Sequence, residues 1–599
     1  MIDLLFTFES NASDLLAAAL GRFRTEPGTR VLKWSGRWGS LACTGSAYPG
    51  FDPVETRRHI AVVLGGPLPR RDRSVASGEA CDDGTRWILR NGVESREIAW
   101  DDDLVGSFLV AVVDKQAGEV MVVTDIDSFV PAYSTDGNQG VPTVVGSHAD
   151  AVALAAGVQE DLDLVSIGDF LSYGTVTYPC TMYERVTQLP PASIIRFGGT
   201  GRPQVEEYWT LGEESRQFSL EDLARQLRET VIANVERMCV GQKEVSLFMS
   251  GGEDSRAVAS VVPVGTRVRA VTFLDSLNRE GRIAERVARR LGLDWKAVMR
   301  SPTIYLDHAC QSMLLCESHG FFQQAHFKGL ERNVSAGMRV LGAVLSDTLC
   351  KSHYAHGRLT EAGIKFGVSR NQWQYQYSAS IARRLPSSLV QQVRARRSIR
   401  NAQLRRCRPF TWAEWHSLAP ASMRMDITYS IANRRLFFMF EPFMDSRIFK
   451  LSAITPQSWK LNGRLFHRAM RPVFRKTWDI PHGNGTMPYF GLWVNAPLRL
   501  LGTARAMMAL VSRKAGFPSK LIRNEGPWSD FHAMVQTPEF LRMAAECNRV
   551  MEQLSADDSL AWLRDVLRFD DRLTALERFR VLHVLLWVSA VWRKTDNRA

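Results

Sequence analysis

The sequence has few of the features that mark secreted, membrane-spanning or disordered chains. Its nine cysteines are scattered, odd in number and without a CxxC pair, which favours reduced thiols in a cytoplasm over a disulfide framework. The longest strongly apolar run, residues 581–592, is 12 residues long and contains His583, whereas a bilayer span needs roughly 20. The N-terminal MIDLLFTFES has no basic region ahead of its apolar residues. We therefore expect no signal peptide and no membrane insertion.

Long low-complexity segments are also missing, and apolar residues make up 45% and charged residues 23% of the chain. These values are close to the average for soluble folded proteins and exclude extensive disorder. A chain of 599 residues is several times longer than an ordinary domain. Two or more domains are therefore expected.

The net charge of +12 is unevenly distributed. Residues 1–210 hold 17 Lys and Arg against 28 Asp and Glu, which leaves 58 against 35, or +23, for residues 211–599. A basic half favours a polyanionic partner such as a nucleotide, an acidic peptide or a nucleic acid. Its densest basic stretch, residues 394–408, fits either a solvated helical face or a docking surface for an acidic chain.

Short apolar segments bounded by turn residues predict a sheet-rich, antiparallel domain over residues 1–210. The predicted strands include residues 59–66, 106–114, 119–125 and 192–199. From Ser219 the period becomes helical, with Leu223, Leu227, Val231 and Val235 on one face, so we place the domain boundary between residues 205 and 218.

Strands and helices alternate after this boundary, which predicts a parallel α/β sheet. The predicted strands are residues 244–249, 267–274 and 294–299, and the helices between them are residues 254–262 and 280–292. Beyond about residue 300 we expect mainly helix, with a basic insertion around residues 370–410 and a helical extension from about residue 490. The second domain then covers residues 211–599.

The hexapeptide Ser250-Gly251-Gly252-Glu253-Asp254-Ser255 lies between the buried strand 244–249 and a helix. Glycines there let the backbone approach a ligand, and the free N–H groups of the turn and helix start form an anion-binding nest. The two serine hydroxyls can donate to phosphate oxygens, and Asp254 favours Mg²⁺ bridging two phosphates. The chain has no GxxxxGK[ST] sequence, which excludes a Walker-type loop.

This segment resembles the SGGxDS signature of the pyrophosphate-loop synthetases, and the chain most resembles the asparagine synthetase superfamily. Supporting matches are residues 181–197, Tyr208-Trp209, residues 280–292, Pro442-Phe443-Met444-Asp445 and residues 465–470. The resemblance implies an αββα amidotransferase-like sandwich followed by an α/β synthetase domain. That synthetase domain would adenylate a carboxylate with ATP and Mg²⁺ before an amine attacks.

The resemblance also implies individual site residues. ATP-binding positions are Leu247, Ser250, Gly251, Gly252, Asp254, Ser255 and Phe273, and the metal ligands are Asp254 and Asp347. Asp426 falls where the family places an acid near the nucleophilic amine. The family lysine falls on Lys476, with His482 as the alternative. His353 and His356 have HxxH spacing without further matched ligands, so we interpret them as structural.

Position 2 is Ile, where a glutamine-hydrolysing member needs a cysteine with a free α-amine. Cys43 and Cys81 cannot supply that amine, so we expect no ammonia from glutamine. Branches of the family that lack this cysteine close rings, and the long basic second half suggests a peptide substrate. The resulting hypothesis is a cytoplasmic lasso-peptide cyclase that joins an Asp or Glu side chain of a precursor peptide to the peptide's N-terminal amine, with a leader peptidase as partner.

Two alternatives stay open at this point. One is a synthetase acting on a small molecule, as in β-lactam formation. The other is a non-catalytic protein whose basic surface binds nucleic acid, which the intact hexapeptide disfavours because a scaffold has no use for Asp254.

Overall fold

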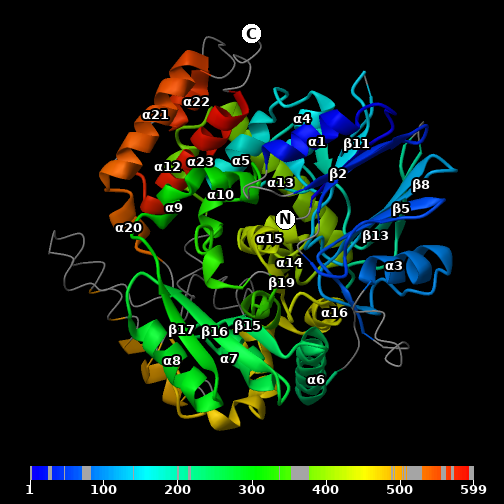
Figure 1. Ribbon diagram of the computed structural model, residues 1–599. Coiled ribbons are helices and arrows are strands. Elements are labelled where there is room, and N and C mark those ends of the chain that lie inside the picture. Colours follow the sequence, from blue (N-terminus) through cyan, green and yellow to red (C-terminus); the bar gives the residue numbers. More distant parts are fainter. Residues whose placement is uncertain are drawn as a thin grey trace.

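The structure is a computed structural model of the chain (Figure 1). It describes residues 3–23, 30–45, 48–70, 83–138, 140–198, 202–213, 218–335, 337–351, 377–483, 485–487, 490, 493–498, 500–501, 504, 508, 529–554, 561–567 and 572–592. Ile2, Cys81, His353 and His356, which carried predictions from the sequence, lie outside these residues.

The first 207 residues build two antiparallel sheets, each with six strands in the described part of the chain. The order in the first is β12 (Val186–Gln188), β10 (Tyr133–Thr135), β11 (Val144–Gly146), β1 (Leu4–Thr7), β3 (Gly39–Thr44), β2 (Val31–Gly36). The order in the second is β14 (Gln204–Glu207), β13 (Ser193–Phe197), β9 (Glu119–Thr124), β8 (Leu109–Asp114), β5 (His59–Leu64), β4 (Val54–Glu55). A separate short pair joins β6 (Leu68–Pro69) and β7 (Leu104–Val105).

The side-chain alternation of β1 explains how these sheets stack. Leu4 and Phe6 belong to the same buried cluster as Val62 and Val110 of the second sheet. Leu5 instead belongs to the cluster that contains Leu16 of α1 (Ser13–Arg22). Because successive side chains of a strand point to opposite faces, one face of the first sheet packs on the second sheet and the other on helices.

Helices cover the outer faces of this sandwich. α1 and α4 (Ala149–Ala156) contact the first sheet, and α3 (Gly84–Ile88) contacts the second. The arrangement is the layered antiparallel domain that the sequence predicts, and Figure 1 shows its sheets in blue and cyan.

A parallel sheet follows in the second half of the chain. Its order among the described strands is β17 (Asp294–Met299), β16 (Arg267–Leu274), β15 (Glu244–Phe248), β18 (Arg339–Leu341), β19 (Phe438–Phe440). The neighbouring strands all pair in parallel. The mixed α/β class predicted from the sequence is confirmed.

Helices surround this sheet. The first, α6 (Leu220–Cys239), begins at the Ser219 cap, whose hydroxyl accepts from the Asp222 N–H. The others used below are α7 (Glu253–Val261), α8 (Arg279–Leu291), α10 (Ala309–Cys316), η4 (Ser346–Cys350), α14 (Trp412–His416), η6 (Ala421–Met423), α15 (Ile427–Leu436), α16 (Ser446–Ile454), α18 (Arg464–Met470) and η8 (Val473–Lys476).

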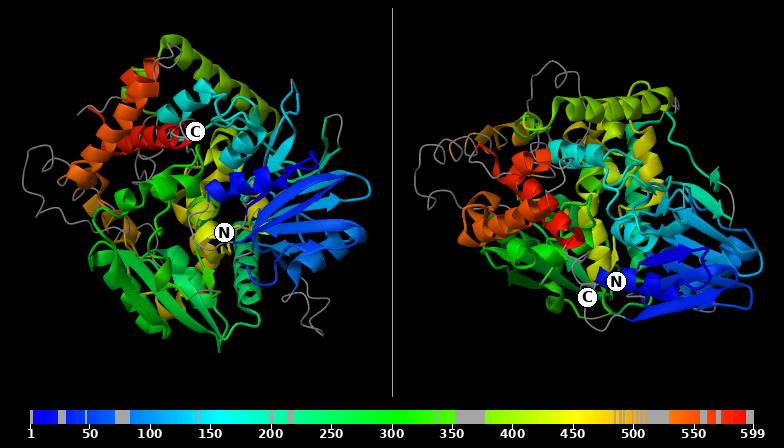
Figure 2. Two further views of the ribbon diagram at one scale, coloured as in Figure 1. Left: turned by 45° about the horizontal axis from the view of Figure 1, so that its top comes forward. Right: turned by 90° about the horizontal axis from the view of Figure 1, so that it is seen from above.

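The basic stretch of the sequence lies in α13 (Ser387–Cys407), which runs beside α5 (Leu164–Tyr173) of the first half (Figure 2). Arg396 and Arg397 form ion pairs with Asp163 and Asp169 of that half. Arg400 lies over the ring of Tyr178, 5.2 Å from its centroid. Much of this stretch therefore binds the N-terminal half of the chain itself.

The last described helices are α20 (Phe531–Met534), α21 (Pro538–Leu554), α22 (Ala561–Leu567) and α23 (Ala575–Trp592). The apolar run predicted to be too short for a bilayer forms most of α23, and its His583 is fully buried against Ser318. Among the described helices, none combines the length and the apolarity that a membrane span requires.

Candidate active site

The loop of Ser250–Ser255 lies where the order of the parallel sheet reverses. The chain adds β16 and β17 on one side of β15 and then β18 and β19 on the other side. Loops that leave the carboxyl ends of two strands at such a point diverge, and the crevice between them is where ligands bind in open α/β sheets. Here the two loops are residues 249–252 after β15 and residues 342–345 after β18.

Hydrogen bonds within the hexapeptide fix the loop shape. The Ser250 N–H donates to Ser255 Oγ at 3.0 Å, the two serine hydroxyls are 2.9 Å apart, and the Gly252 N–H donates to Ser250 Oγ at 3.1 Å. The Gly251 N–H donates to Glu280 Oε1 at 2.6 Å. A Cβ on Gly251 would lie 2.9 Å from Glu280 Oε2 and 3.0 Å from the Glu280 backbone oxygen, so glycine makes room for this close approach.

Three acidic side chains converge on one lysine beside this loop. Lys351 Nζ lies 2.5 Å from Asp254 Oδ1, 2.7 Å from Asp347 Oδ1 and 2.9 Å from Glu253 Oε1. The lysine side chain is only 12% exposed, whereas that of Asp347 is 56% exposed. The cluster thus has a buried cation at its base and opens to solvent on the Asp347 side.

Burial and mutual repulsion set the charges in this cluster. Burial and the neighbouring Asp347 raise the pKa of Asp254 to about 7, although Lys351 opposes the rise. Burial alone would lower the pKa of Lys351, but Asp254, Asp347 and Glu253 hold it well above its usual range. Glu253 also lies 3.0 Å from His467 Nε2, so Lys351 is not the only basic group beside these carboxylates.

These carboxylates fit a magnesium ion. Asp254 and Asp347 both reach within 2.7 Å of a single point, the Lys351 nitrogen, and carboxylate oxygens are the ligands that Mg²⁺ prefers. Among the described residues no group of three or more His, Cys, Asp or Glu side chains is arranged as a complete metal site. Mg²⁺ usually keeps waters and substrate phosphates as its other ligands, so two carboxylates suffice.

The segment after α18 also meets the loop. The Gly483 N–H donates to the Gly251 carbonyl oxygen at 2.9 Å, and His482 Nε2 lies 3.9 Å from Glu253 Oε2. Burial lowers the pKa of His482 to about 4, so this ring is neutral near pH 7. Lys476 is exposed on η8, and Lys351 is the lysine that the structure brings to the acids of the loop.

The remaining predicted positions differ in their surroundings. Asp426 Oδ2 accepts a hydrogen bond from Thr348 Oγ1 at 3.1 Å. Thr348 directly follows Asp347, so the structure brings Asp426 to the same edge of the sheet as Asp347. The side chain of Leu247 is fully buried in β15, and Phe273 lies in an aromatic cluster 5.4 Å from Phe248. Their side chains belong to the core, and in the sheet Leu247 pairs with Ala270 on one side and Leu341 on the other.

Two acids near the site were not singled out from the sequence alone. Glu441, at the end of β19, accepts from the Val344 N–H at 2.9 Å, and burial raises its pKa to about 8. A Cβ on Gly342 would lie 2.2 Å from Glu441 Oε1, so the glycine after β18 makes room for this acid. The second is Glu280, whose pKa burial also raises.

Lys351 was missed as well, although its spacing carries a signal. It follows Asp347 by four residues, which places both on one face of a helical turn.

Asp445 of the matched tetrapeptide has a structural role. It accepts from the Arg447 N–H at the start of α16 and forms an ion pair with Arg70 at 2.6 Å.

The fold defines a two-part protein. A layered antiparallel domain is joined to an open parallel α/β sheet, and that sheet carries the candidate site. The family model described as "Glutamine amidotransferase domain" matches residues 95–209 of the chain. A curated protein of Bacillus subtilis (strain 168), "Asparagine synthetase [glutamine-hydrolyzing] 3", is 24% identical over 169 residues. That alignment covers 27% of this chain and 27% of the relative, so the chain matches about a quarter of the relative's length. Both matches support a relationship to the asparagine synthetase superfamily.

The chain also matches solved structures, among them the following two. An allosteric regulatory enzyme of purine biosynthesis has 11% identity and a TM-score of 0.22, covering 51% of this chain and 81% of its own. Glutamine phosphoribosylpyrophosphate amidotransferase from B. subtilis, complexed with ADP and GMP, has 8% identity and a TM-score of 0.21, covering 66% and 89%. TM-scores this low support no inference about function.

Proposed function

We propose that the protein is an AMP-forming amide synthetase that closes a macrolactam ring in a peptide, as a lasso-peptide cyclase does. The observation that carries the proposal is the loop of Ser250–Ser255 at the reversal point of the parallel sheet, with Asp254 and Asp347 meeting at one cation. A tight turn alone would need the glycines and one serine but not these two acids.

The proposed reaction has two steps. A carboxylate oxygen of the peptide attacks the α-phosphorus of ATP and releases pyrophosphate, and the peptide's amine then attacks the acyl carbon, loses a proton and displaces AMP. Mg²⁺, held by Asp254 and Asp347, would neutralise phosphate charge. The loop N–H groups of Gly251 and Gly252 can donate to phosphate oxygens, because their present acceptors are side chains that can turn away.

Lys351 is the residue that we assign to the developing charge on the α-phosphate. It is held at the loop by three carboxylates and its pKa is well above its usual range, so it stays protonated. A preorganised cation at this point stabilises the transition state without reorganising. Asp426, one hydrogen bond from Thr348, is the candidate acceptor for the amine proton.

The ring-closing step follows from the proposed source of the amine. In the described N-terminal half, Cys43 is fully buried in β3, and burial raises the pKa of its thiol to about 12. Burial also raises the pKa of the Cys180 thiol. Thiols that stay protonated are poor nucleophiles for glutamine hydrolysis, so we assign the amine to the substrate itself. Tethering the amine can supply an effective molarity of roughly 10⁵ M.

A peptide substrate is supported by the basic second half, with +23 over residues 211–599. A separate leader peptidase is part of the proposal, because the N-terminal amine must be freed before it can attack. The alternative small substrate, a β-amino acid, is separated by experiment.

The experiment combines pure protein, ATP, Mg²⁺ and a leader-trimmed precursor peptide with an Asp or Glu several residues from its start. We expect AMP, pyrophosphate and a peptide one water lighter, without fragmentation inside the ring in tandem mass spectrometry. Replacing the acceptor by Asn or Gln should stop the reaction. Turnover of β-amino acids alone, or a peptide with an amidated side chain and a free N-terminus, would overturn the cyclase assignment.

A further inference from the structure

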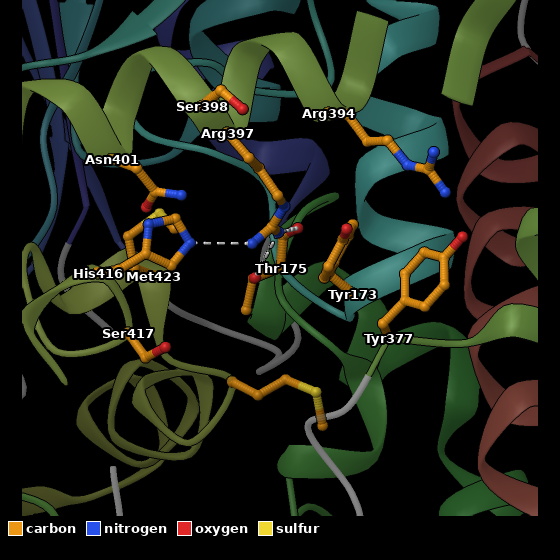
Figure 3. Close-up of a pocket in the computed structure, with 11 residues that line it drawn as sticks. Tyr173, Thr175, Tyr377, Arg394, Arg397, Ser398, Asn401, His416, Ser417 and Met423 are labelled. Atoms are coloured by element: carbon orange, nitrogen blue, oxygen red, sulfur yellow. Dashed lines mark hydrogen bonds between the residues drawn. The ribbon is translucent and has the colours of Figure 1, made fainter. Parts of the chain in front are cut away.

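A cavity of about 510 Å³ lies between α5 of the N-terminal half and α13 (Figure 3). This volume is within the range of pockets that hold small ligands. Its lining includes Tyr173, Tyr377, Arg394, Arg397, Asn401 and His416.

The charge of the cavity is positive. None of its lining residues is acidic, and two are arginines. Arg397 is engaged, because its guanidinium donates to Asp169 at 2.6 Å and to the Thr175 carbonyl oxygen at 3.1 Å. Arg394 is exposed and forms no hydrogen bond or ion pair with any other described residue. It is the cation that a ligand can recruit.

Two polar atoms of the lining are buried without a partner among the described residues, Asn401 Oδ1 and His416 Nδ1. His416 Nε2 lies 3.3 Å from an Arg397 nitrogen, which can only donate, so Nε2 accepts. Burial lowers the pKa of His416 to about 3, so the ring is neutral and its proton lies on Nδ1. His416 thus offers a buried donor with no acceptor, as expected of a site for an anionic ligand.

The other side chains of the lining are aromatic, apolar or small hydroxyl groups. Tyr173 stacks under Arg397, whose Cζ is 3.8 Å from the ring centroid, and Tyr377 lies 5.1 Å from Tyr173. Met423 and Met425 also line the cavity, together with Thr175, Ser398 and Ser417. A ligand with one anionic group and an apolar body matches these walls better than a bare ion does.

The start of α15 links the cavity to one predicted site residue. Met425 directly precedes Asp426, which is hydrogen-bonded to Thr348 beside Asp347. For one peptide to occupy both sites, its acidic side chain would lie at Asp254 and Lys351 and a more distant part of its chain in this cavity. The activated carboxylate cannot be in both places, and every unmodified peptide has one further carboxylate at its C-terminus.

We propose that this cavity binds the free C-terminal carboxylate of the peptide substrate, with Arg394 as the principal cation and the tyrosine and methionine side chains holding the last side chain. The inference rests on the proposed function for the identity of the peptide. The proposal gives a role to Arg394, a residue of the basic stretch of α13 that forms no hydrogen bond or ion pair with the other described residues.

The test measures binding, without ATP, of acetyl-Gly-Gly-Phe and of its C-terminal amide to the full-length protein by calorimetry or saturation-transfer NMR. The acid should bind about tenfold or more tighter than the amide, because a charge-assisted arginine contact is lost in the amide. Arg394→Gln should weaken the acid about tenfold and leave the amide unchanged. Arg406→Gln, an exposed arginine of the same helix outside the cavity, is the matched control and should change neither.

A second variant tests the cavity rather than the charge. Ser398 lines it from the exposed side of α13, so Ser398→Trp should fill the space and weaken acid and amide alike. Equal binding of acid and amide, or no loss with Arg394→Gln, would overturn the proposal. Displacement of the peptide by millimolar inorganic phosphate would also overturn it, since the site would then serve phosphate.

A separate measurement distinguishes this proposal from the proposed function. If the peptide acid binds as expected but no carboxylate substrate ever yields AMP, the cavity assignment stands and the synthetase assignment falls. If AMP forms and Arg394→Gln leaves the KM for the precursor unchanged, the synthetase stands and the cavity assignment falls.

Discussion

Asp254 is the residue at which binding and repulsion compete most directly. Its carboxylate touches Lys351, yet burial and Asp347 raise its pKa to about 7. We predict that Asp254→Ala lowers AMP release by at least about 10²-fold, because it removes one of the two metal ligands. Quantifying AMP and pyrophosphate by chromatography checks this.

The fold should survive the change, because Asp254 contributes to the cluster and not to the core. The thermal midpoint of the variant should therefore stay close to that of the wild type. Glu285→Ala, which removes only a helix-surface partner of Arg289, is the control and should keep full activity. ADP and phosphate as products would contradict the adenylation chemistry.

Lys351 and Lys476 give a direct comparison of two lysines. Lys351 lies against Phe466, 4.3 Å from its ring centroid, and against three acids, whereas Lys476 is exposed. We predict that Lys351→Met lowers kcat by about 10²-fold or more while Lys476→Met changes it less than about threefold. Steady-state kinetics on both variants measure the two effects. A larger loss of kcat in Lys476→Met would instead assign this role to Lys476, the lysine that the family resemblance implies.

At the scale of elements, Glu441 connects the ends of two strands. It follows β19 and accepts a hydrogen bond from the Val344 N–H in the loop after β18. Its pKa of about 8 when folded is above the ordinary value of 4.5, so the folded chain binds more protons. The stability that this acid contributes is fully present below about pH 4.5 and is lost as the pH rises through about 8. We predict that Glu441→Gln, which keeps an oxygen for the Val344 N–H, removes this loss.

Denaturant unfolding at several pH values measures the effect. The advantage of the glutamine variant should grow between pH 4.5 and 8 with a slope of up to about 1.4 kcal/mol per pH unit. The difference at pH 4, where the acid is neutral in both states, reports any steric cost beside Gly342 and serves as the internal control. Parallel pH profiles for both proteins would show that folding does not raise the pKa of Glu441.

Elements with a long, regular pattern could be predicted from the sequence. Residues 267–274 form β16 as predicted, and α8 covers 279–291 where 280–292 was expected. β18 and β19 were not predicted because each has three residues, too few for alternation to show. Their existence depends on pairing beside β15, which is a tertiary effect.

The candidate site divides in the same way. The hexapeptide was predicted because its residues are adjacent in the chain and its chemistry depends on that adjacency. Lys351 and Glu441 were missed because they reach the loop only through the order of strands in the sheet. The partners of Arg396 and Arg397 lie more than 200 residues away, so the sequence left open whether this helix is a solvated face or a docking surface for an acidic chain.

For the whole molecule, a buried ion cluster joins the two halves. Arg435 of α15 donates to Asp3 at 2.9 Å and to Glu317 at 2.8 Å, and its side chain is fully buried. We predict that Arg435→Met lowers the free energy of unfolding by about 3–5 kcal/mol at pH 7, because two carboxylates lose their buried partner. Arg267→Met, at an exposed ion pair, should cost less than about 1 kcal/mol.

This cluster also predicts a pH dependence. Despite burial, which works in the opposite direction, Arg435 and Arg434 lower the pKa of Asp3 to about 2. The stability from Asp3 is therefore present above pH 3.8 and is lost as the pH falls towards 2. The gap between wild type and Arg435→Met should shrink over that range in acid unfolding curves. A gap that stays constant would contradict the assignment.

The N-terminal half should not release ammonia from glutamine. We predict no glutamate above background when pure protein is incubated with glutamine, because Cys43 stays protonated inside β3. A coupled glutamate dehydrogenase assay checks this, with a glutamine-hydrolysing synthetase as the positive control. Saturable glutaminase activity would require a nucleophile elsewhere in the chain.

The ion pairs that α13 and Arg435 form with the N-terminal half have a consequence for the expression of the two halves. Asp3, Asp163 and Asp169 find their arginine partners only across the boundary between the halves. Expressed separately, each half would carry unneutralised charges on a freshly exposed apolar surface, so neither is a self-sufficient module. On the proposed function, the N-terminal half is retained for these contacts and not for thiol chemistry. Fragments split at residues 208–219 should therefore fold only when both are produced together.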